Sequence, residues 1–390
     1  MSTLALRVWA LYHAGSMRLL FVSHSFPPTG APMSNVGGMQ RVATELHAAL
    51  QSRDDVVMRT IALRSSWKWV HLKAVPFLFW LAFRLEREAA AFRADAILFT
   101  SMTTALPLLL AGPALKKRGI RTAAIAHGLD VTDPNPLYQR AVRRLCRLLD
   151  GALPVSRATG DQLVARGLAR DRVRVVPNAV DLPRFDGVFA ERGRPPRARI
   201  AAAPDLTDGA FLLVTVGRQV RRKGFAWFIE NVMPKLPPRV AFWLAGDGPE
   251  RDEIEASIER AQLRDRVARL GKISEAELLE LYRRGQLFVM PNILVPGDME
   301  GFGIVMLEAG ACGLPTLAAD LEGIRDVIEE GVNGWLVPSG DADAFAMRIQ
   351  SLLDDPELLR EASRRTLQHV TSTFRWEHTA ERYLDVLRSL

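Results

Sequence analysis

Cysteine is scarce in this chain of 390 residues, with only Cys146 and Cys312 present. The two lie in segments that the patterning below assigns to different domains, and their spacing matches neither a disulfide framework nor a zinc site. The cysteine content therefore fits a reducing compartment such as the cytoplasm. Acidic residues and histidines form no obvious cluster either, so the sequence predicts no metal site and no metal cofactor.

Long apolar runs are also missing. No stretch reaches the roughly 18–20 apolar residues that a helix needs to cross a bilayer. The first sixteen residues are apolar with one arginine, but His13 interrupts them and no small-residue cleavage site is evident. We expect residues 1–16 to be a disordered extension in front of a strand that starts at Met17, and not a signal peptide.

Acidic residues are few in the first half of the chain. Residues 1–182 contain 24 Lys and Arg against 12 Asp and Glu, whereas the remainder contains 27 against 32, and the formal net charge is +7. A basic half is typical of proteins that meet nucleic acid, anionic lipid or phosphorylated substrates. No helix-turn-helix, zinc finger or RNA-binding aromatic motif is present, so we expect no nucleic-acid partner.

Short apolar strands alternate with helical patterns along two separate halves. The length is too great for one ordinary core, and the alternation predicts an α/β protein with two Rossmann-like doubly wound domains. Residues 185–204, rich in Pro, Gly and Arg, have little periodicity and read as a linker. We therefore expect domains at residues 1–186 and 205–374, followed by an amphipathic helix near 375–390. The expected strands are 18–23, 56–63, 96–100, 121–127, 151–155, 173–176, 211–216, 240–245, 267–270, 287–290, 316–318 and 334–337.

The most informative stretch is E-G-F-G-I-V-M-L-E, which places Glu300 and Glu308 eight positions apart. The glycines between them allow close approach of the backbone to a ligand, and a helix that begins near Ile304 directs free N–H groups toward an anion such as a diphosphate. Both acids can then face one hydroxyl-rich ligand. Solvated surface acids are the alternative, which the apolar flanks disfavour.

A second cluster follows the strand that ends at Gly217. The sequence G-R-Q-V-R-R-K-G brings four cations into the loop after that strand, where open α/β sheets bind their ligands. Arg can hold two oxygens of a diphosphate at once and Lys acts as a point charge, so a diphosphate site is favoured over a solvated charge run. The four cations are Arg218, Arg221, Arg222 and Lys223.

Three weaker signals accompany these clusters. Gly37 and Gly38 precede a helix and either approach a phosphate or form a simple tight turn. Gly248 lies in the turn A-G-D-G-P, which does not match the G-x-G-x-x-G fingerprint, so a nicotinamide cofactor is not supported. His127 ends a strand, and on the residues alone a satisfied structural histidine is the usual interpretation. The D-x-D of Asp341 and Asp343 reads as a helix start and not as a metal site.

Residues 67–93 combine aromatic and basic side chains at helical spacing. Two interpretations stay open: a helix that lies in a membrane interface, or a pair of core helices with a basic solvent face. The residues concerned are Trp67, Trp69, Phe77, Phe79, Trp80 and Phe83, interleaved with Lys68, Lys73, Arg84, Arg87 and Arg93.

Taken together, these stretches resemble the GT-B glycosyltransferases of the retaining type called family 4. The resemblance covers most of the chain from Met17 and is strongest over 214–341. It is carried by G-G-M-Q-R, V-S-R-A-T, V-P-N-A-V-D, G-R-x-x-R-R-K-G, A-G-D-G-P, E-G-F-G-I-V-M-L-E-A-G-A-C-G-L-P and G-x-N-G-W-L-V-P, in that order. The implied fold has two Rossmann-like domains facing a central cleft, with a C-terminal helix that crosses back to the first.

The resemblance also implies roles for individual residues around a nucleotide-sugar donor, which is a substrate and not a cofactor. Arg218 and Lys223 match the pair at the diphosphate, and Glu308 matches the acid at the ribose hydroxyls. Glu300 matches the acid beside the transferred sugar. Backbone contacts come from Phe302, Gly303 and Ile304, and Gly38 and His127 of the first domain match residues near the phosphates and the sugar.

One segment departs from the family pattern. Many relatives have a Gly-Gly pair, often followed by Pro-Glu, where this chain has Leu321-Glu322-Gly323-Ile324-Arg325-Asp326. The resemblance implies that this loop lies near the donor, where it helps to choose the sugar.

The sequence therefore predicts a retaining, metal-independent enzyme that moves a hexose from a UDP- or GDP-linked donor to a hydroxyl of a lipid-linked or cell-envelope glycan. The basic, aromatic first domain suggests the cytoplasmic face of the plasma membrane, with an anionic membrane surface as a partner. Two alternatives are a sugar-nucleotide epimerase of the same fold and a non-catalytic nucleotide-sugar-binding protein. The sequence makes no prediction of oligomeric state.

Overall fold

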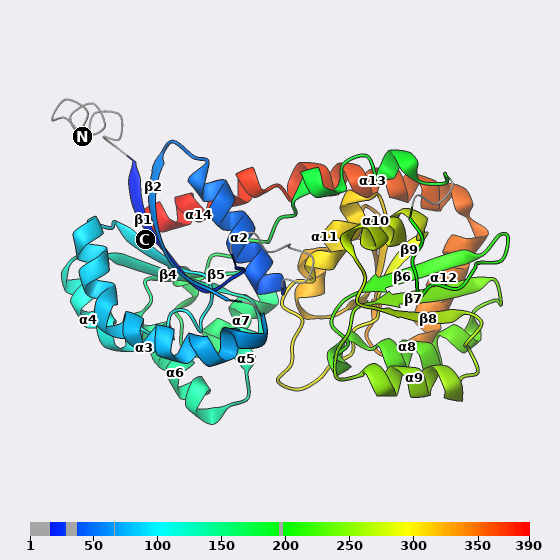
Figure 1. Cartoon of the computed structure of the whole chain (residues 1–390), viewed down its shortest axis with the longest axis horizontal. Coiled ribbons are helices and arrows are strands. Elements are labelled where there is room, and N and C mark those ends of the chain that lie inside the picture. Colours follow the sequence, from blue (N-terminus) through cyan, green and yellow to red (C-terminus); the bar gives the residue numbers. More distant parts are fainter. Residues whose placement is uncertain (1–15, 29–36, 66, 195–197) are drawn as a thin grey trace. The chain divides into compact units, whose positions relative to one another are not determined.

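The computed structural model describes residues 16–28, 37–65, 67–194 and 198–390. The chain forms two compact units, of which the first comprises the residues up to Asn178 together with Trp376–Leu390, and the second comprises Ala179–Arg375. Each unit is an α/β domain with its own parallel sheet (Figure 1). Residues 1–15, where we expect an extension, lie outside the described part of the chain.

The described residues of the first unit form a five-stranded parallel sheet in the order β2-β1-β3-β4-β5. Because β1 has β2 on one side and β3 on the other, the direction of winding reverses between β1 and β3, and ligands of such sheets bind beyond the carboxyl ends of the strands at that point. The strands are β1 (Met17–Phe26), β2 (Val56–Arg64), β3 (Ala96–Phe99), β4 (Arg121–Ala126) and β5 (Gly151–Pro154).

Helices cover this sheet and bury its apolar strands. The helices are α2 (Gly38–Gln51), α3 (Trp67–Phe92), α4 (Leu108–Lys117), α5 (Leu129–Thr132), α6 (Pro136–Leu148), α7 (Arg157–Ala165) and α14 (Trp376–Ser389). Helix α3 packs beside α4, and α4 packs beside α6, so these three form one continuous layer. The core below them joins Leu20 and Val22 of β1, Phe99 of β3 and Leu85 of α3.

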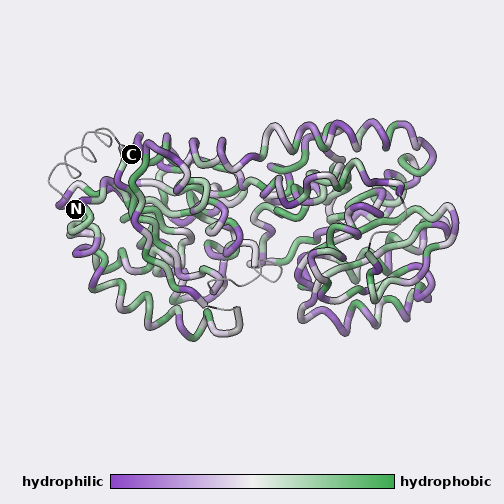
Figure 2. The backbone as a smooth tube through the Cα atoms, turned by 45° about the horizontal axis from the view of Figure 1, so that its top comes forward, coloured by the Kyte–Doolittle hydropathy of each residue, from purple (hydrophilic) through white to green (hydrophobic). Residues whose placement is uncertain are grey.

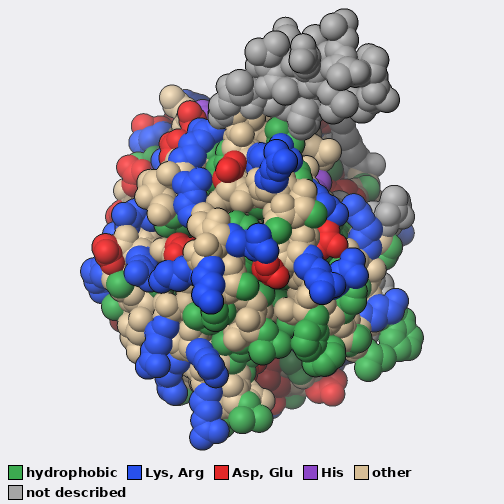
Figure 3. All heavy atoms as spheres, turned by 90° about the vertical axis from the view of Figure 1, so that its left-hand side faces the viewer, with side chains coloured by type: hydrophobic (Ala, Val, Ile, Leu, Met, Phe, Trp, Pro, Cys, Tyr) green, Lys and Arg blue, Asp and Glu red, His purple; other side chains and the backbone are tan. Residues whose placement is uncertain are grey.

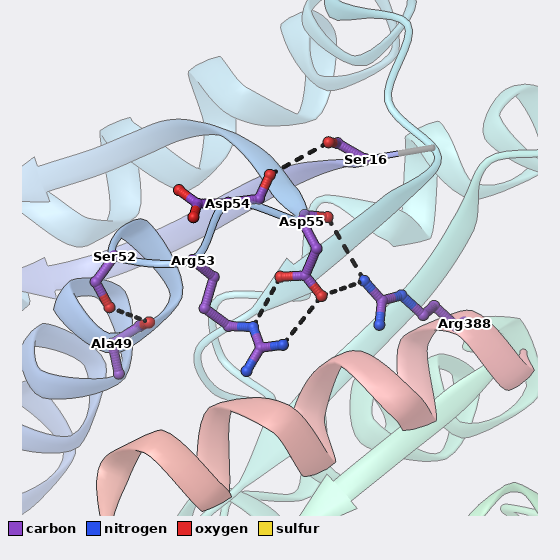
Figure 4. Close-up of polar contacts among 7 residues, drawn as sticks. All are labelled: Ser16, Ala49, Ser52, Arg53, Asp54, Asp55 and Arg388. Carbon is purple, nitrogen blue, oxygen red and sulfur yellow. Dashed lines mark hydrogen bonds and ion pairs between the residues drawn. The ribbon is translucent and has the colours of Figure 1, made fainter. Parts of the chain in front are cut away.

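Helix α14 belongs to the first unit although it follows the whole of the second in sequence. It packs against α2, and the indole of Trp376 donates to the Glu45 carboxylate over 2.6 Å. At its other end Arg388 binds Asp55 over 2.8 Å, and Arg53 binds the same carboxylate over 2.8 Å (Figure 4). These hydrogen bonds, that of Arg53 first, lower the pKa of Asp55 despite partial burial. The helix therefore docks through both ends.

The second unit has a six-stranded parallel sheet in the order β11-β10-β9-β6-β7-β8 among its described residues. This is the strand order of dinucleotide-binding folds, whose switch point lies between the first and fourth strands, here β6 and β9. The strands are β6 (Phe211–Val216), β7 (Val240–Ala245), β8 (Val267–Gly271), β9 (Leu287–Met290), β10 (Thr316–Asp320) and β11 (Gly334–Pro338).

The helices of the second unit enclose its sheet from both sides. They are α8 (Phe225–Asn231), α9 (Arg251–Arg260), α10 (Glu275–Arg284), α11 (Ile304–Ala311), α12 (Ala342–Asp354) and α13 (Pro356–Thr373). Asp341 caps α12 by accepting a hydrogen bond from the Ala344 N–H, which confirms the predicted helix start. In Figure 2 the strands inside each unit are largely hydrophobic, whereas the outer helices alternate between hydrophilic and hydrophobic turns. None of the described helices is long and apolar enough to span a bilayer.

Two sequence-based expectations about this region need correction. Residues 173–176 form no full strand: Arg174 and Val176 donate to carbonyls of β5, but only an isolated bridge at Val173 results. The expected linker at 185–204 belongs to the second unit. Arg192 of that segment donates to the carbonyls of Tyr282 and Gly285 over 2.9 and 2.7 Å, so this arginine fastens the segment to the C-terminal end of α10.

Candidate active site

The loops after β6 and β9 meet at the switch point of the second sheet. Gly224 ends the turn after β6 with φ of 66°, and a Cβ at this position would lie 2.0 Å from the Pro291 carbonyl oxygen. A side chain there would force the two loops apart, so glycine is required by both its left-handed backbone and its contact. This close approach brings Lys223 alongside the residues that follow β9.

Glu300 and Lys223 form a buried ion pair at this point. The Lys223 ammonium lies 2.6 Å from Glu300 Oε2, and the two residues are 5% and 7% exposed. The Asn292 amide donates to the same oxygen over 3.1 Å, and Arg222 Nε lies 3.5 Å from it. The other oxygen, Oε1, has no hydrogen bond to a described residue, so it is the atom that a ligand hydroxyl can reach.

The electrostatics of this pair favour an ionised carboxylate. Burial raises the pKa of Glu300, but the charges of Lys223 and Arg222 and the hydrogen bonds to Oε2 outweigh burial, and the net shift is downward. Burial, opposed by the Glu300 carboxylate, lowers the pKa of Lys223. A carboxylate held in this way is suited to stabilising positive charge on a neighbouring group and is poorly suited to accepting a proton.

The four cations of the loop after β6 divide into two pairs. Arg222 and Lys223 are committed to acids, since Arg222 Nη1 lies 2.8 Å from Asp298 and Lys223 binds Glu300. Arg218 and Arg221 are exposed and form no ion pair with another residue in the described part of the chain. The exposed pair is therefore free to bind an anionic ligand, whereas Arg222 and Lys223 organise the acids.

Residues 300–304 lead from the ion pair into α11. Gly303 has φ of 87° and is the N-cap of α11, which begins at Ile304 as expected. Phe302 is buried, and its ring packs against Phe374 at 6.4 Å between centroids. The loop is thus anchored by an aromatic contact while the helix N-terminus offers N–H groups that an anion can bind.

Glu308 lies in α11 and belongs to a second polar cluster. Its carboxylate accepts a hydrogen bond from Arg184 over 3.1 Å and one from the Tyr282 hydroxyl over 3.1 Å, and Glu308 is only 2% exposed. Arg184 also binds both oxygens of Glu275 in α10. Both oxygens of Glu308 thus already have protein partners, although a carboxylate has about four lone-pair positions in all.

Gly248 has a structural reason to be glycine. A Cβ there would lie 2.2 Å from the Gln219 carbonyl oxygen, and one at Gly246 would lie 2.0 Å from that of Gly217. The turn after β7 is therefore pressed against the loop after β6. Gly248 supports the loop that carries Arg218, whatever contact it makes with a ligand.

In the first unit, His127 lies directly after β4 and is half-buried. Its Nε2 donates to the Thr100 carbonyl over 2.9 Å, and its backbone N–H donates to Asp130 over 2.7 Å. The other oxygen of Asp130 accepts from the Met102 N–H over 3.0 Å. These contacts fix the ring at the carboxyl edge of the sheet and leave Nδ1 as its second polar atom.

Sequence reasoning missed the polar side chains at the β1/β3 switch point of this sheet. His24 Nδ1 lies 2.7 Å from the Thr104 hydroxyl, and Ser101 bonds the same hydroxyl over 2.8 Å. Thr100 donates to Ser23 over 2.9 Å. The S-H-S sequence at the end of the first strand was the available signal, because a histidine after an apolar strand marks the same edge as His127.

Gly37 and Gly38 stand at the start of α2. Gly37 is the N-cap with φ of −64°, so these glycines are not explained by a left-handed tight turn. A Cβ at Gly38 would meet no described atom within 4 Å. Packing within the described chain therefore leaves room above this helix N-terminus, as close approach of a phosphate requires. The preceding residues 29–36 lie outside the described part.

The predicted site residues thus fall into four groups within the two units. The second unit brings Glu300, Lys223 and Arg222 into contact, and its Glu308 joins Arg184 and Tyr282. Arg218, Gly248, Phe302, Gly303 and Ile304 line the loops around them. His127, Gly37 and Gly38 belong to the first unit. No group of three or more His, Cys, Asp and Glu in the described residues is arranged to hold a metal ion.

Two protein families match successive parts of the chain. The family described as "Glycosyltransferase Family 4" matches residues 36–184, and that described as "Glycosyl transferases group 1" matches residues 197–369. The first match lies almost wholly in the first unit and the second lies in the second unit. Together they span most of the described chain.

Curated relatives and solved structures point the same way. A putative colanic acid biosynthesis glycosyltransferase, WcaL, of Escherichia coli K12 is 29% identical over 324 residues, which cover 80% of this chain and 75% of that protein. A D-inositol 3-phosphate glycosyltransferase of Nocardia farcinica is 30% identical over 278 residues, covering 68% of this chain and 58% of that protein.

The structures of two proteins have the same fold over 96% of this chain. Anabaena HepE in complex with UDP has a TM-score of 0.71 with 19% identity over its full length. Sucrose-phosphate synthase of Thermosynechococcus elongatus has a TM-score of 0.72 with 21% identity over 98% of its length. With two parallel-sheet Rossmann-like domains, this chain belongs to the group 1 glycosyltransferases of the GT-B fold.

Proposed function

We propose that this glycosyltransferase moves a hexose from a nucleoside-diphosphate sugar to a hydroxyl acceptor with retention of the anomeric configuration. The observation that carries the proposal is the buried Glu300–Lys223 pair at the β6/β9 switch point, beside the exposed Arg218 and Arg221. The fixed carboxylate can stabilise positive charge on a polyhydroxylated sugar ring, and the free arginines can bind a diphosphate. A nucleoside-diphosphate sugar contains both groups.

The diphosphate binds in this proposal between the exposed arginines and the N-terminus of α11. Arg218 and the N–H groups that follow Gly303 stabilise negative charge as it develops on the leaving group, without a metal ion. Glu308, oriented by Arg184 and Tyr282, accepts hydrogen bonds from the ribose hydroxyls. UDP is the favoured nucleotide, since structures of HepE, which has the same fold, contain UDP and UDP-glucose.

The transfer step balances without an external base. The bond from the anomeric carbon to the diphosphate oxygen breaks, and the acceptor oxygen bonds to the same face of that carbon. The acceptor proton passes to the departing phosphate oxygen. Glu300, kept ionised by Lys223, stabilises the positive charge that develops on the sugar ring.

The acceptor is a lipid-linked or cell-envelope glycan. This part of the proposal is supported by relatives named for the biosynthesis of colanic acid and amylovoran, and by the surface of the first unit. Helix α3 exposes a row of large apolar side chains that nothing in the described chain covers. They are Trp69, Leu72, Val75, Phe79, Trp80 and Phe83, with exposed fractions of 46–71%.

Positive charge accompanies this apolar row. Helix α6, in the same helical layer, has four exposed arginines at helical spacing, Arg140, Arg143, Arg144 and Arg147. Figure 3 shows one side of the molecule, on which Lys and Arg side chains are widespread and a patch of hydrophobic side chains lies beside them. Aromatic side chains next to a basic face are typical of helices that lie in the interface of an anionic membrane.

The test is a donor screen with the full chain. The protein is incubated with UDP- and GDP-hexoses and glycan-lipid acceptors, in the presence of a chelator, and nucleotide release and product anomer are followed by chromatography and proton NMR. We expect transfer from one donor, an anomeric configuration equal to that of the donor, and no effect of chelation. Isomerised donor without acceptor would indicate an epimerase, and donor binding without transfer to any acceptor would indicate a binding protein.

A further inference from the structure

Glu322 stands in the loop where this chain departs from the Gly-Gly pair of its family. It is the first residue of a short 3-10 turn, Glu322–Asp326, and it has φ of 47°. Such a left-handed backbone is unfavourable for a residue with a Cβ, and it persists only where surrounding contacts over-determine it. A glycine would adopt this conformation without strain, so contacts made by the glutamate must hold this backbone in place.

The contact that retains it is with the backbone of Glu300. The N–H of Glu300 donates to Glu322 Oε2 over 2.6 Å. The next residue, Gly323, donates its own N–H to the Glu300 carbonyl over 3.2 Å. The main chain of Glu300 is thus held on both sides by two consecutive residues of one turn.

The turn is also pressed closely against this part of the chain. A Cβ on Gly323 would lie 2.0 Å from the Gly301 carbonyl oxygen and 2.9 Å from that of Glu300. Only a glycine permits this approach, and the approach brings the Glu322 carboxylate within reach of the Glu300 N–H. The side chain of Glu300 is fixed separately by Lys223 and Asn292.

We propose that Glu322 is a positioning residue for glycosyl transfer, because its carboxylate clamps the backbone of Glu300 and so sets where the Glu300 carboxylate meets the transferred sugar. This rests on the proposed role of Glu300. Glu322 acts on the sugar end of the donor and not on the nucleotide, which the Glu308 cluster and the arginines hold. Its replacement therefore changes turnover and leaves nucleotide binding intact.

Three substitutions separate positioning from stability. Glu322→Gln keeps an acceptor oxygen at the same reach, Glu322→Ala removes the acceptor but keeps the strained backbone, and Glu322→Gly removes both the acceptor and the strain. We expect kcat to fall about tenfold in the Ala and Gly variants, in line with the loss of one charge-assisted hydrogen bond, with donor KM and UDP affinity unchanged. Glu322→Gln retains wild-type kcat within about twofold, which is less than the loss of one hydrogen bond would produce.

Melting temperatures provide the contrast. The Gly variant, relieved of strain, melts above the Ala variant, yet both have the same low kcat. A kcat that follows melting temperature, with Glu322→Gly close to wild type, would show that Glu322 is merely structural and would overturn the proposal. Glu329→Gln, an exposed acid further along the same segment, is the matched control and leaves both quantities unchanged.

Hydrogen exchange tests the contact between Glu322 and the Glu300 backbone without the need for enzymatic turnover. Hydrogen exchange at the Glu300 amide is expected to accelerate in the Ala and Gly variants and not in Glu322→Gln. Unchanged exchange in the first two would refute the clamp even in an active enzyme. Conversely, a wild-type protein that transfers no sugar but has a protected Glu300 amide would refute the proposed function while leaving the clamp intact.

Discussion

Glu300 and Lys223 are buried together, so neither charge can be removed alone without leaving the other unpaired. Breaking a buried pair in this way costs about 3–5 kcal/mol, whereas replacing both members with neutral side chains of similar volume is often close to neutral. The catalytic and structural contributions of this pair can therefore be separated by comparing single and double substitutions.

We predict that Glu300→Gln lowers kcat about 100-fold or more, since a fixed charge opposite the transition state is lost, and also lowers the melting temperature. Glu300→Gln combined with Lys223→Met is expected to recover the melting temperature without recovering kcat. Steady-state kinetics and calorimetry measure the two effects. Recovery of activity in the double variant would remove Glu300 from the site.

The pKa of Glu322 makes the stability of the folded protein depend on pH. Burial, and then the nearby Glu300 carboxylate, raise the pKa of Glu322 above its ordinary value of 4.5. The ionised form therefore destabilises the folded state at a pH above the folded pKa, and this cost disappears below the unfolded pKa, where both states are protonated.

We therefore expect Glu322→Gln to gain melting temperature relative to wild type as the pH rises from below 4.5 through neutrality. Thermal denaturation of both proteins across this range measures the difference. A difference that is constant with pH, or that shrinks as the pH rises, would contradict the expected sign.

At the scale of elements, the segment after the crossing between units acts as a strap on α10 and α11. Residues 182–185 form a 3-10 turn, and Arg184 in it joins Glu275 of α10 to Glu308 of α11. The aromatic ring of Phe185 packs against Tyr282, which bonds the other oxygen of Glu308. The acid proposed to hold the ribose is thus oriented by a 3-10 turn that lies outside α10 and α11.

We predict that Arg184→Ala weakens binding of UDP about tenfold, because Glu308 loses a charged partner that orients its carboxylate. Isothermal titration calorimetry with UDP measures this effect. Arg170→Ala, whose side chain is 75% exposed, is the control and should bind as wild type does. Tighter binding by Arg184→Ala would instead mean that Arg184 blocks the nucleotide site.

The exposed apolar row of helix α3 leads to a separate prediction about membrane binding. We expect Phe79→Ser with Trp80→Ser to reduce co-sedimentation with anionic phosphatidylglycerol vesicles at low salt, and Arg143→Glu with Arg147→Glu to reduce it and its salt dependence. Met347→Ser, which removes an apolar side chain of 67% exposure in the second unit, should have no effect. Wild-type protein that fails to co-sediment at low salt would refute membrane docking.

Sequence reasoning succeeded where local pattern decides the structure. The strands, the start of α11 and the N-cap of α12 follow from apolar runs, glycine turns and capping residues, and all except 173–176 are present near the expected positions. It failed where contacts over long sequence separations decide, as with Arg184, which binds Glu308, and with His24 in the other unit, which contacts Thr104. The expected linker failed for the same reason, because Arg192 and Arg283 find backbone carbonyls that no local pattern reveals.

At the scale of the whole molecule, the second unit interrupts the first in sequence. Its ends are joined by a hydrogen bond from the Val180 N–H to the Phe374 carbonyl over 3.1 Å. The first unit is completed by α14, in which Tyr383 is fully buried. The hydroxyl of Tyr383 has no hydrogen-bond partner among the described residues. The hydroxyl therefore costs stability, while the ring contributes to it.

We predict that Tyr383→Phe raises the melting temperature of the first unit slightly, and that Tyr383→Ala destabilises that unit by about 3–5 kcal/mol through the cavity it leaves. Differential scanning calorimetry assigns each transition, with UDP, the proposed ligand of the second unit, added to shift the transition of that unit. Equal loss of stability in both units would show that they do not unfold as separate bodies.

The place of α14 in the first unit has a consequence for synthesis on the ribosome. The second unit emerges complete before α14 is translated, so it can fold while the first unit still lacks the helix that covers α2. During that interval the apolar surface later covered by Tyr383, Leu384 and Leu387 is open to chaperones. The nascent chain therefore acquires its second unit first, and the first unit becomes native only when α14 arrives.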